Sequence, residues 1–199
     1  MEQHPLKSFG KPEGLVGHFL GLVMSKSNRK LGEWTIEVLH LDDGVDVLEI
    51  GFGPGTTIEL MTQKYPNAFI AGIDHSDVMV KQATRRNRKA VSEGRVEIRE
   101  GSVAALPYEG ESFDNVYAIN SFQFWPDRLA NLKEVKRVLK KGGNIAITLQ
   151  PRWTKSDDEV RQVGKEVSDW LTDAGYQNIH ISFKVMNPIS AICVTAQKK

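Results

Sequence analysis

Glycine recurs at every second position directly after an apolar run, and this pattern constrains the local fold more than any other feature of the chain. Residues 45–50 are rich in β-branched side chains, which favours a buried strand. Gly51, Gly53 and Gly55 follow, and Thr56 opens a segment with helical apolar spacing. Glycine has no Cβ and reaches positive φ at low cost, so the backbone of such a turn can approach a ligand closely. The unpaired N–H groups of the following helix's first turn favour an anionic or carboxylate group at the same place.

The spacing of the glycines separates two classes of ligand. Dinucleotide-binding turns carry G-x-G-x-x-G, in which the third glycine comes five residues after the first. Here the third glycine comes four residues after the first, and Thr56 occupies the dinucleotide position. Glu49 precedes the loop, where a carboxylate would repel a pyrophosphate and suit a ligand that carries positive charge. The alternative is a plain structural turn after a core strand, because glycine turns also occur without a ligand.

With Glu49 as its acidic residue, the glycine stretch resembles the first motif of the class I S-adenosylmethionine-dependent methyltransferases, an acidic residue followed by G-x-G-x-G. Residues 134–143 read E-V-x-R-V-L-K-x-G-G ahead of a predicted strand, which is similar to the methyltransferase-11-like small-molecule subgroup that includes quinone-biosynthesis enzymes. The resemblance extends from about residue 31 to the C-terminus. It implies an α/β, Rossmann-like doubly wound sheet of seven strands, mostly parallel with an antiparallel C-terminal strand. It also implies an N-terminal helical cover segment, residues 1–40, and a methyltransferase domain, residues 41–199, within a single domain overall.

Hydrophobic periodicity and turn residues place the other elements. We predict strands at 45–50, 68–73, 95–99, 113–119, 144–149, 178–186 and 190–196, and helices at 56–65, from 76 onward, at 131–140 and at 157–174. Residues 14–41 are expected to form two helices broken near 25–28, of which the second should pack on the sheet. The resemblance implies that this leading segment covers the cofactor and shapes the substrate pocket. His18, Met24 and Asn28 are the candidates, with solvated surface or simple packing as the alternative for each.

Asp74 ends the second predicted strand and carries the next candidate function. It follows the glycine loop by about 20 positions, the separation at which an acidic residue holds a ribose in dinucleotide sites. A carboxylate can accept two hydrogen bonds from a vicinal diol, and the resemblance gives Asp74 the same role. The competing role is a helix cap, which Ser76 and Asp77 can already supply. His75 and Met79 are expected along the adenosine, with Met79 as an apolar wall.

Gly101 and Ser102 follow the third predicted strand and resemble the adenine-binding segment of the family. Ser102 stands where an acidic residue commonly meets the adenine amino group, and its hydroxyl can accept that hydrogen bond without charge assistance. The backbone N–H of Val103 is expected to meet a ring nitrogen. The expected cofactor site also includes Phe52 in the glycine loop and Asn120 after the fourth strand.

The loop at residues 120–127 is rich in aromatic side chains. Ligands of open α/β sheets bind beyond the carboxyl ends of the strands, so this loop is expected beside the methyl group. It lacks the N/D-P-P-Y/F sequence that holds a planar amino group in DNA and protein-glutamine N-methyltransferases, which argues against a base or amide nitrogen as acceptor. At least two of the loop aromatics Phe122, Phe124 and Trp125 are expected to be core residues. The expected substrate pocket comprises His18, Met24, Gln123 and Trp125.

Composition limits the partners. The 199 residues include 26 Lys and Arg against 25 Asp and Glu, which gives no electrostatic case for nucleic acid or an anionic membrane. The basic stretch at residues 81–89 lacks interleaved aromatics, so an exposed helix face is favoured over phosphate contacts. Cys193 is the single cysteine and is expected to be buried, which fits a reducing, cytoplasmic compartment and gives no structural metal site. Apolar runs are of strand length, so no membrane association is expected.

The activity implied by the resemblance is methyl transfer from S-adenosyl-L-methionine to a small-molecule acceptor by in-line displacement. No catalytic residue is assigned, because nothing in the sequence places His18, Tyr108, Tyr117 or Asp127 at the methyl group. One alternative is a binding or regulatory protein of the same fold without turnover, and another is a nicotinamide oxidoreductase. The expected partner is a small-molecule substrate, and a homodimer is left open.

Overall fold

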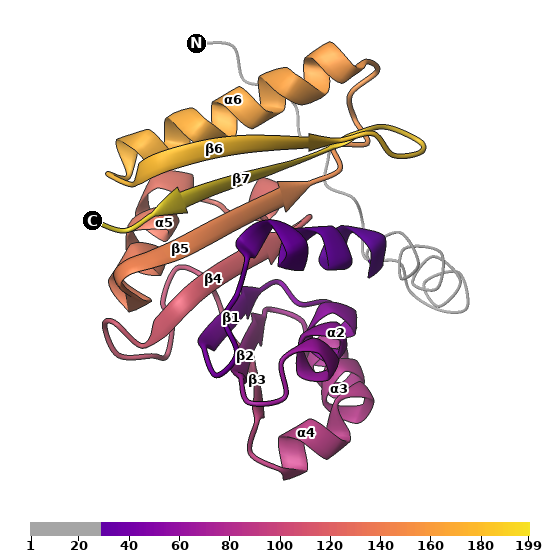
Figure 1. Ribbon diagram of the computed structural model, residues 1–199, viewed down its shortest axis with the longest axis vertical. Coiled ribbons are helices and arrows are strands. Elements are labelled where there is room, and N and C mark those ends of the chain that lie inside the picture. The colour runs from indigo at the N-terminus through magenta and orange to yellow at the C-terminus, as the bar shows by residue number, and fades with distance from the viewer. Residues whose placement is uncertain (1–28) are drawn as a thin grey trace.

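The computed structural model describes residues 29–199 and contains one seven-stranded sheet in the order β3-β2-β1-β4-β5-β7-β6 (Figure 1). Its strands are β1 (Asp46–Ile50), β2 (Phe69–Asp74), β3 (Val96–Glu100), β4 (Phe113–Ile119), β5 (Leu139–Leu149), β6 (Gln177–Lys184) and β7 (Ala191–Gln197). The first five run parallel, and β7 lies antiparallel between β5 and β6. The chain reverses its winding direction between β1 and β4, so the predicted doubly wound sheet with an antiparallel C-terminal strand is confirmed.

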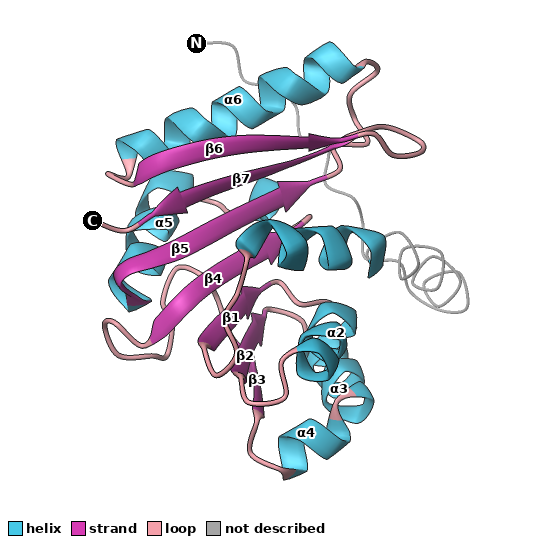
Figure 2. Ribbon diagram, in the orientation of Figure 1, coloured by secondary structure: helices cyan, strands magenta, loops and turns pink. Residues whose placement is uncertain are grey.

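Helices cover both faces of the sheet. They are a helix over residues 29–39, α2 (Thr56–Lys64), α3 (Asp77–Arg86), α4 (Arg88–Ser92), the short 3₁₀ helix η1 (Phe122–Phe124), α5 (Arg128–Val138) and α6 (Asp157–Asp173). Figure 2 shows the 29–39 helix and α2 to α4 on one side of the sheet and α5 and α6 on the other. Two apolar clusters correspond to the two sides, one with Leu31 and Ile58 and one with Leu132 and Leu171.

The helix over residues 29–39 packs on the sheet, as predicted for the second helix of the leading segment. Its side chains Leu31, Trp34 and Ile36 are buried in the apolar cluster on this side of the sheet. The hydroxyl groups of Thr35 and Thr148 lie 2.7 Å apart, which satisfies two buried polar atoms between the helix and β5. None of the helices within residues 29–199 is both long enough and apolar enough to cross a lipid bilayer.

The boundary between α5 and β5 differs from the prediction. The sequence predicts a helix over 131–140 closed by the following glycines, but α5 begins at Arg128 and ends at Val138. Leu139 already pairs with Phe113 of β4, and β5 continues through Gly142 and Gly143. Pairing with a neighbouring strand therefore overrides the helical periodicity of the last predicted turn, and the predicted helix end was wrong by two residues.

Candidate functional site

The glycine loop between β1 and α2 adopts the left-handed backbone that its composition predicts. Gly51, Gly53 and Gly55 have φ of 76°, 53° and 75°. A Cβ on Gly51 would lie 2.5 Å from Cβ of Ser121, and one on Gly55 would lie 2.7 Å from Cβ of Ala83. Among the described residues, no atom lies within 4 Å of a Cβ on Gly53. The loop is thus fixed by packing on two sides and open at Gly53, where main chain is accessible to a ligand.

The beginning of α2 suits a negatively charged group. Gly55 is the N-cap residue, and no side chain within residues 29–199 caps the helix. The N–H groups of a helix's first turn have no intrahelical partner and attract anions. Oγ1 of Thr56 is buried without a hydrogen-bond partner among the residues that the structure describes. These donors beside the open side of Gly53 fit the carboxylate of an amino-acid group such as the one in S-adenosylmethionine.

Asp74 lies at the end of β2 and contacts the glycine loop. Its carboxylate is 7% exposed, with Oδ2 accepting a 2.9 Å hydrogen bond from Gly53 N–H and Oδ1 accepting one of 3.0 Å from Ser76 N–H. Ser76 itself caps α3, because its Oγ accepts from Met79 N–H. An ionised carboxylate has about four acceptor positions, so two remain for the hydroxyls of a ligand.

The residues that follow Asp74 differ in exposure. The His75 side chain is 90% exposed, with Nδ1 3.6 Å from Asp74 Oδ1. Met79 is half-buried and packs against the apolar cluster that includes Phe52. The Phe52 ring is buried against Gly72, so this side chain belongs to the core. The structure thus brings Asp74 and Gly53 together and directs the Phe52 side chain into the core.

The predicted adenine segment begins beside Asp74. Gly101 N–H donates a 2.9 Å hydrogen bond to Asp74 O, and a Cβ on Gly101 would lie 2.6 Å from Cδ1 of Ile73. Ser102 is exposed, and its Oγ accepts from Ala104 N–H at 3.2 Å. Val103 is buried in the core. A side chain at position 101 would therefore have to displace the end of the Ile73 side chain, and the Ser102 hydroxyl already accepts one backbone hydrogen bond.

Glu49 is almost completely buried and lies next to polar groups from three elements. Oε2 accepts a 2.9 Å hydrogen bond from the Tyr117 hydroxyl, and Thr57 is a further hydrogen-bond partner. Burial is the main cause that raises the pKa of Glu49 from 4.5 to about 8. The nearby Asp74 charge raises this pKa as well, while the hydrogen bonds from Tyr117 and Thr57 lower it.

The loop after β4 is held by Asn120 and by aromatic packing. Asn120 has φ of 50°, and its Oδ1 accepts from Gln150 N–H at 2.8 Å. Gln123 Nε2 donates to Asn120 O at 2.9 Å, and its Oε1 is buried without a partner in the described part of the chain. Phe122 and Trp125 are buried with ring centroids 5.1 Å apart, whereas Phe124 is 72% exposed. Two of the three aromatics are core residues, as expected, and Trp125 is one of them, although the sequence also placed it in the pocket wall.

The candidates for a general base that lie within residues 29–199 are poorly suited to take up a proton from an acceptor. Asp127 caps α5, because its Oδ1 accepts from Ala130 N–H at 3.0 Å. Burial raises the pKa of both Tyr108 and Tyr117 well above their usual value near 10, so neither hydroxyl ionises at neutral pH. His18 lies outside the described residues, as do Met24 and Asn28. Within residues 29–199, no group of three or more His, Cys, Asp and Glu side chains could hold a metal ion.

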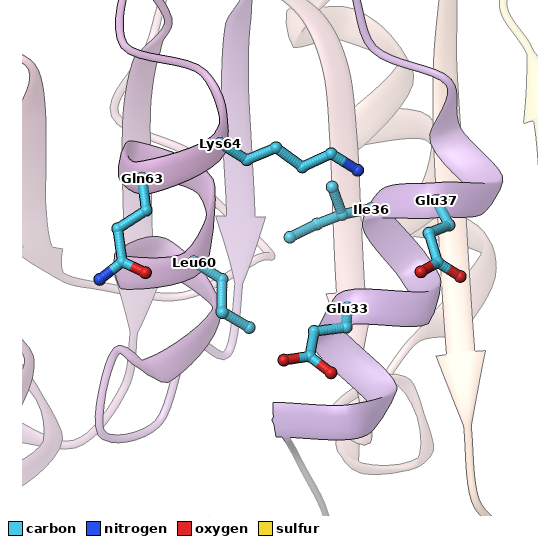
Figure 3. A pocket seen from close by; sticks show the side chains of 6 residues that line it. All are labelled: Glu33, Ile36, Glu37, Leu60, Gln63 and Lys64. Atoms are coloured by element: carbon cyan, nitrogen blue, oxygen red, sulfur yellow. The ribbon is translucent and has the colours of Figure 1, made fainter.

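Two surface hollows lie elsewhere on the described chain. One of about 340 Å³ lies between α2 and the 29–39 helix, and Figure 3 shows its lining residues Leu60, Gln63 and Lys64 opposite Glu33, Ile36 and Glu37. The other, of about 560 Å³, is lined in part by Arg85, Arg86, Arg88 and Lys89. These four residues are exposed, which confirms the basic stretch as an exposed face. Neither is lined by the glycine loop or Asp74. The site is therefore located by the loop's open side and not by either hollow.

Three supporting residues were not assigned to the site from the sequence. Asn87 Nδ2 donates to Gly55 O at 3.1 Å and to Ala83 O at 3.0 Å, which ties the glycine loop to α3. The Ser121 hydroxyl donates to Ile50 O at 2.7 Å. Tyr117 was considered only as a base, although it is the β4 residue in register with Glu49. The sequence carried no signal for the contact between Tyr117 and Glu49, because it does not specify the register between β1 and β4.

Comparisons with known proteins agree with this geometry. A family model described as "Methyltransferase domain" matches residues 48–147. The Uncharacterized methyltransferase YdaC of Bacillus subtilis is 34% identical over 179 residues, which cover 89% of this chain and 97% of that protein. The 27-O-demethylrifamycin SV methyltransferase of Amycolatopsis mediterranei is 31% identical over 84% of this chain and 63% of its own length. The crystal structure of a SAM dependent methyltransferase from Aquifex aeolicus shares the fold, with a TM-score of 0.73 and 21% identity over 91% of this chain and 98% of that one.

Proposed function

The chain belongs to the family of S-adenosylmethionine-dependent methyltransferases, and we propose that it methylates a small-molecule acceptor through a cofactor bound at the open side of Gly53. One observation carries this placement. Gly53 has free space where a side chain would be, and its N–H is held by the Asp74 carboxylate. A ligand can therefore contact bare main chain and a carboxylate at the same point.

The roles of the individual residues follow from their hydrogen-bonding capacity. The first turn of α2 would hold the amino-acid carboxylate, because no side chain caps that helix. The remaining acceptor positions of Asp74 would hold the ribose hydroxyls, and the segment that begins at Gly101 would lie along the adenine. The cofactor supplies the electrophilic methyl group, and the protein orients the acceptor and excludes water. Once ionised, Glu49 would place negative charge close to the loop and to the cationic cofactor.

The acceptor pocket is proposed to combine the cover segment, residues 1–40, with the loop that contains Gln123. The buried, unpartnered Oε1 of Gln123 among the described residues supports a hydrogen bond to a substrate group. The Amycolatopsis relative is named for methylating 27-O-demethylrifamycin SV, which supports a small organic acceptor rather than a macromolecule. We further propose that the enzyme works in the cytoplasm as a monomer or a homodimer, which size-exclusion chromatography would distinguish.

The decisive experiment is incubation with methyl-labelled S-adenosylmethionine and fractionated metabolite extract, followed by mass spectrometry of the labelled product. Transfer of label that depends on Asp74 supports the proposal. Binding of the cofactor without transfer to any fraction favours a regulatory protein instead. Thermal stabilisation by NAD but not by S-adenosylhomocysteine would favour an oxidoreductase.

A further inference from the structure

Glu49 and Tyr117 form a buried polar pair directly before the glycine loop. They are register partners on the neighbouring parallel strands β1 and β4. Glu49 is 2% exposed and Tyr117 is fully buried, and their oxygens are 2.9 Å apart. The Glu49 carboxyl group interacts with Asp74 and with Thr57 in the first turn of α2, so a ligand that contacts Asp74 and the start of this helix comes close to Glu49.

The surroundings of Glu49 contain no positive charge from the described residues. The groups that act on its carboxyl group are Tyr117 on β4, Asp74 at the end of β2 and Thr57 in the first turn of α2. These are two hydroxyls and a second carboxylate. A buried carboxylate without a cation favours its protonated form, and a like charge nearby favours it further. The raised pKa of Glu49, about 8, agrees with this environment.

The proposed cofactor would change that environment. S-Adenosylmethionine carries a permanent sulfonium charge and an ammonium group. Placed on the open side of the loop, it would bring positive charge towards both carboxyl groups, and an opposite charge within a few ångströms lowers a carboxyl pKa. A pyrophosphate at the same place would have the opposite effect.

On the premise of the proposed function, we infer that Glu49 is protonated in the free enzyme and releases its proton to solvent when the cationic cofactor binds. Tyr117 acts as the positioning residue, because its hydroxyl donates to the Glu49 carboxyl group in either protonation state. No other bond forms or breaks. This coupling makes the site selective for cations, because only a positively charged ligand stabilises the ionised carboxylate of Glu49.

Isothermal titration calorimetry tests this inference. S-Adenosylmethionine is titrated into the enzyme at pH 7 in two buffers of different ionisation enthalpy, so that the difference in heat gives the protons released. A pKa near 8 predicts release of about 0.9 proton per bound cofactor and an affinity that rises about tenfold from pH 6 to pH 7. The Glu49→Gln variant is expected to remove both effects. Any proton exchange by the cofactor's own amino group remains in this variant, so the difference between the two proteins reports Glu49 alone.

Two tyrosine variants test the inference independently, in case the Glu49→Gln variant does not fold. Tyr117→Phe keeps the ring but removes a hydrogen bond that lowers the Glu49 pKa, so cofactor affinity should fall at pH 7 and its pH dependence should extend to higher pH. Tyr176→Phe is the matched control, because the Tyr176 hydroxyl is also buried but donates to Leu132 O on the other side of the sheet. This control should match the wild type in both affinity and proton release.

The outcomes separate this inference from the proposed function. Absence of binding by wild-type enzyme would refute the cofactor site itself. Binding with no proton release at pH 7, or with equal release from the Glu49→Gln variant, would overturn the inference while leaving the cofactor site intact. An unchanged pH profile in Tyr117→Phe would remove Tyr117 from the positioning role.

Discussion

The backbone N–H of Gly53 donates a 2.9 Å hydrogen bond to Oδ2 of Asp74, which joins the glycine loop to the end of β2. The carboxylate predicted to bind a ribose therefore also holds the loop predicted to face the amino-acid group. Its other oxygen accepts from Ser76 N–H at the beginning of α3. Both halves of the proposed cofactor site thus depend on one side chain.

Replacing Asp74 with alanine should weaken cofactor binding more than it weakens the fold. The variant loses the proposed ribose contacts and the support of Gly53, so we expect the Kd for S-adenosylmethionine to rise at least tenfold, about 1.4 kcal/mol. Calorimetry measures this change. Asp43→Ala is the matched control, because Asp43 also accepts two backbone N–H groups, those of Gly44 and Asn67, before β1 and β2. Equal losses of affinity in the two variants would mean that Asp74 acts only through stability.

A methyl group on Gly53 should interfere with the ligand rather than with the protein. Nothing lies within 4 Å of a Cβ there, so Gly53→Ala adds only the strain of its left-handed backbone, about 1–2 kcal/mol. The added methyl would occupy the ligand's space, and we expect at least a tenfold rise in Kd. Gly94→Ala is the control for strain, because Gly94 has φ of 73° and equally open surroundings. The idea fails if both variants bind the cofactor as well as the wild type does.

The local part of the site could be read from the sequence, and the part that depends on distant contacts could not. The strand, the glycine spacing and Asp74 are encoded within short segments, so their positions were predicted correctly. The Glu49–Tyr117 contact requires the register between β1 and β4, which a single sequence does not specify. The end of α5 was misplaced for the same reason, because Leu139 pairs with the distant Phe113.

Asn87 illustrates a supporting contact that local patterns hide. It lies between α3 and α4, where a polar residue would be expected on the surface, yet it is buried and bonded to Gly55 O and Ala83 O. The basic residues around Asn87 predicted an exposed helix face, so nothing in the sequence indicated that the Asn87 side chain is buried. Only the packing of α3 against the glycine loop makes this amide part of the site.

Removing the Asn87 amide should loosen the loop from α3. Asn87→Ala deletes both side-chain hydrogen bonds, and we expect a loss of about 1–3 kcal/mol in the free energy of unfolding. Cofactor affinity should also fall, because Gly55 is the N-cap residue of α2. Chemical denaturation and calorimetry give the two values. Asn67→Ala serves as the control, because the Asn67 side chain donates to exposed Asp43, and this variant should leave affinity unchanged.

The stability of the cofactor-free enzyme should decrease as pH rises because of Glu49. Its pKa is about 8 in the folded protein and near 4.5 when exposed, so the folded state binds more protons between these values. The Glu49 contribution is therefore fully present below pH 4.5 and is lost as pH rises through 8, with a slope of at most about 1.4 kcal/mol per pH unit. The lowered pKa values of Asp114 and Glu134 act in the opposite direction, in the acid range below the usual carboxyl pKa.

Urea denaturation from pH 5 to pH 8 measures this dependence directly. Subtracting the curve of Glu49→Gln from that of the wild type cancels the contribution of the titrating groups that do not interact with Glu49. The difference should fall steadily over this range, because glutamine keeps an acceptor for the Tyr117 hydroxyl but cannot ionise. Parallel curves for the two proteins would show that Glu49 has the same protonation state in the folded and unfolded chain. The buried carboxyl group would then be stabilised as an anion by contacts beyond Tyr117 and Thr57.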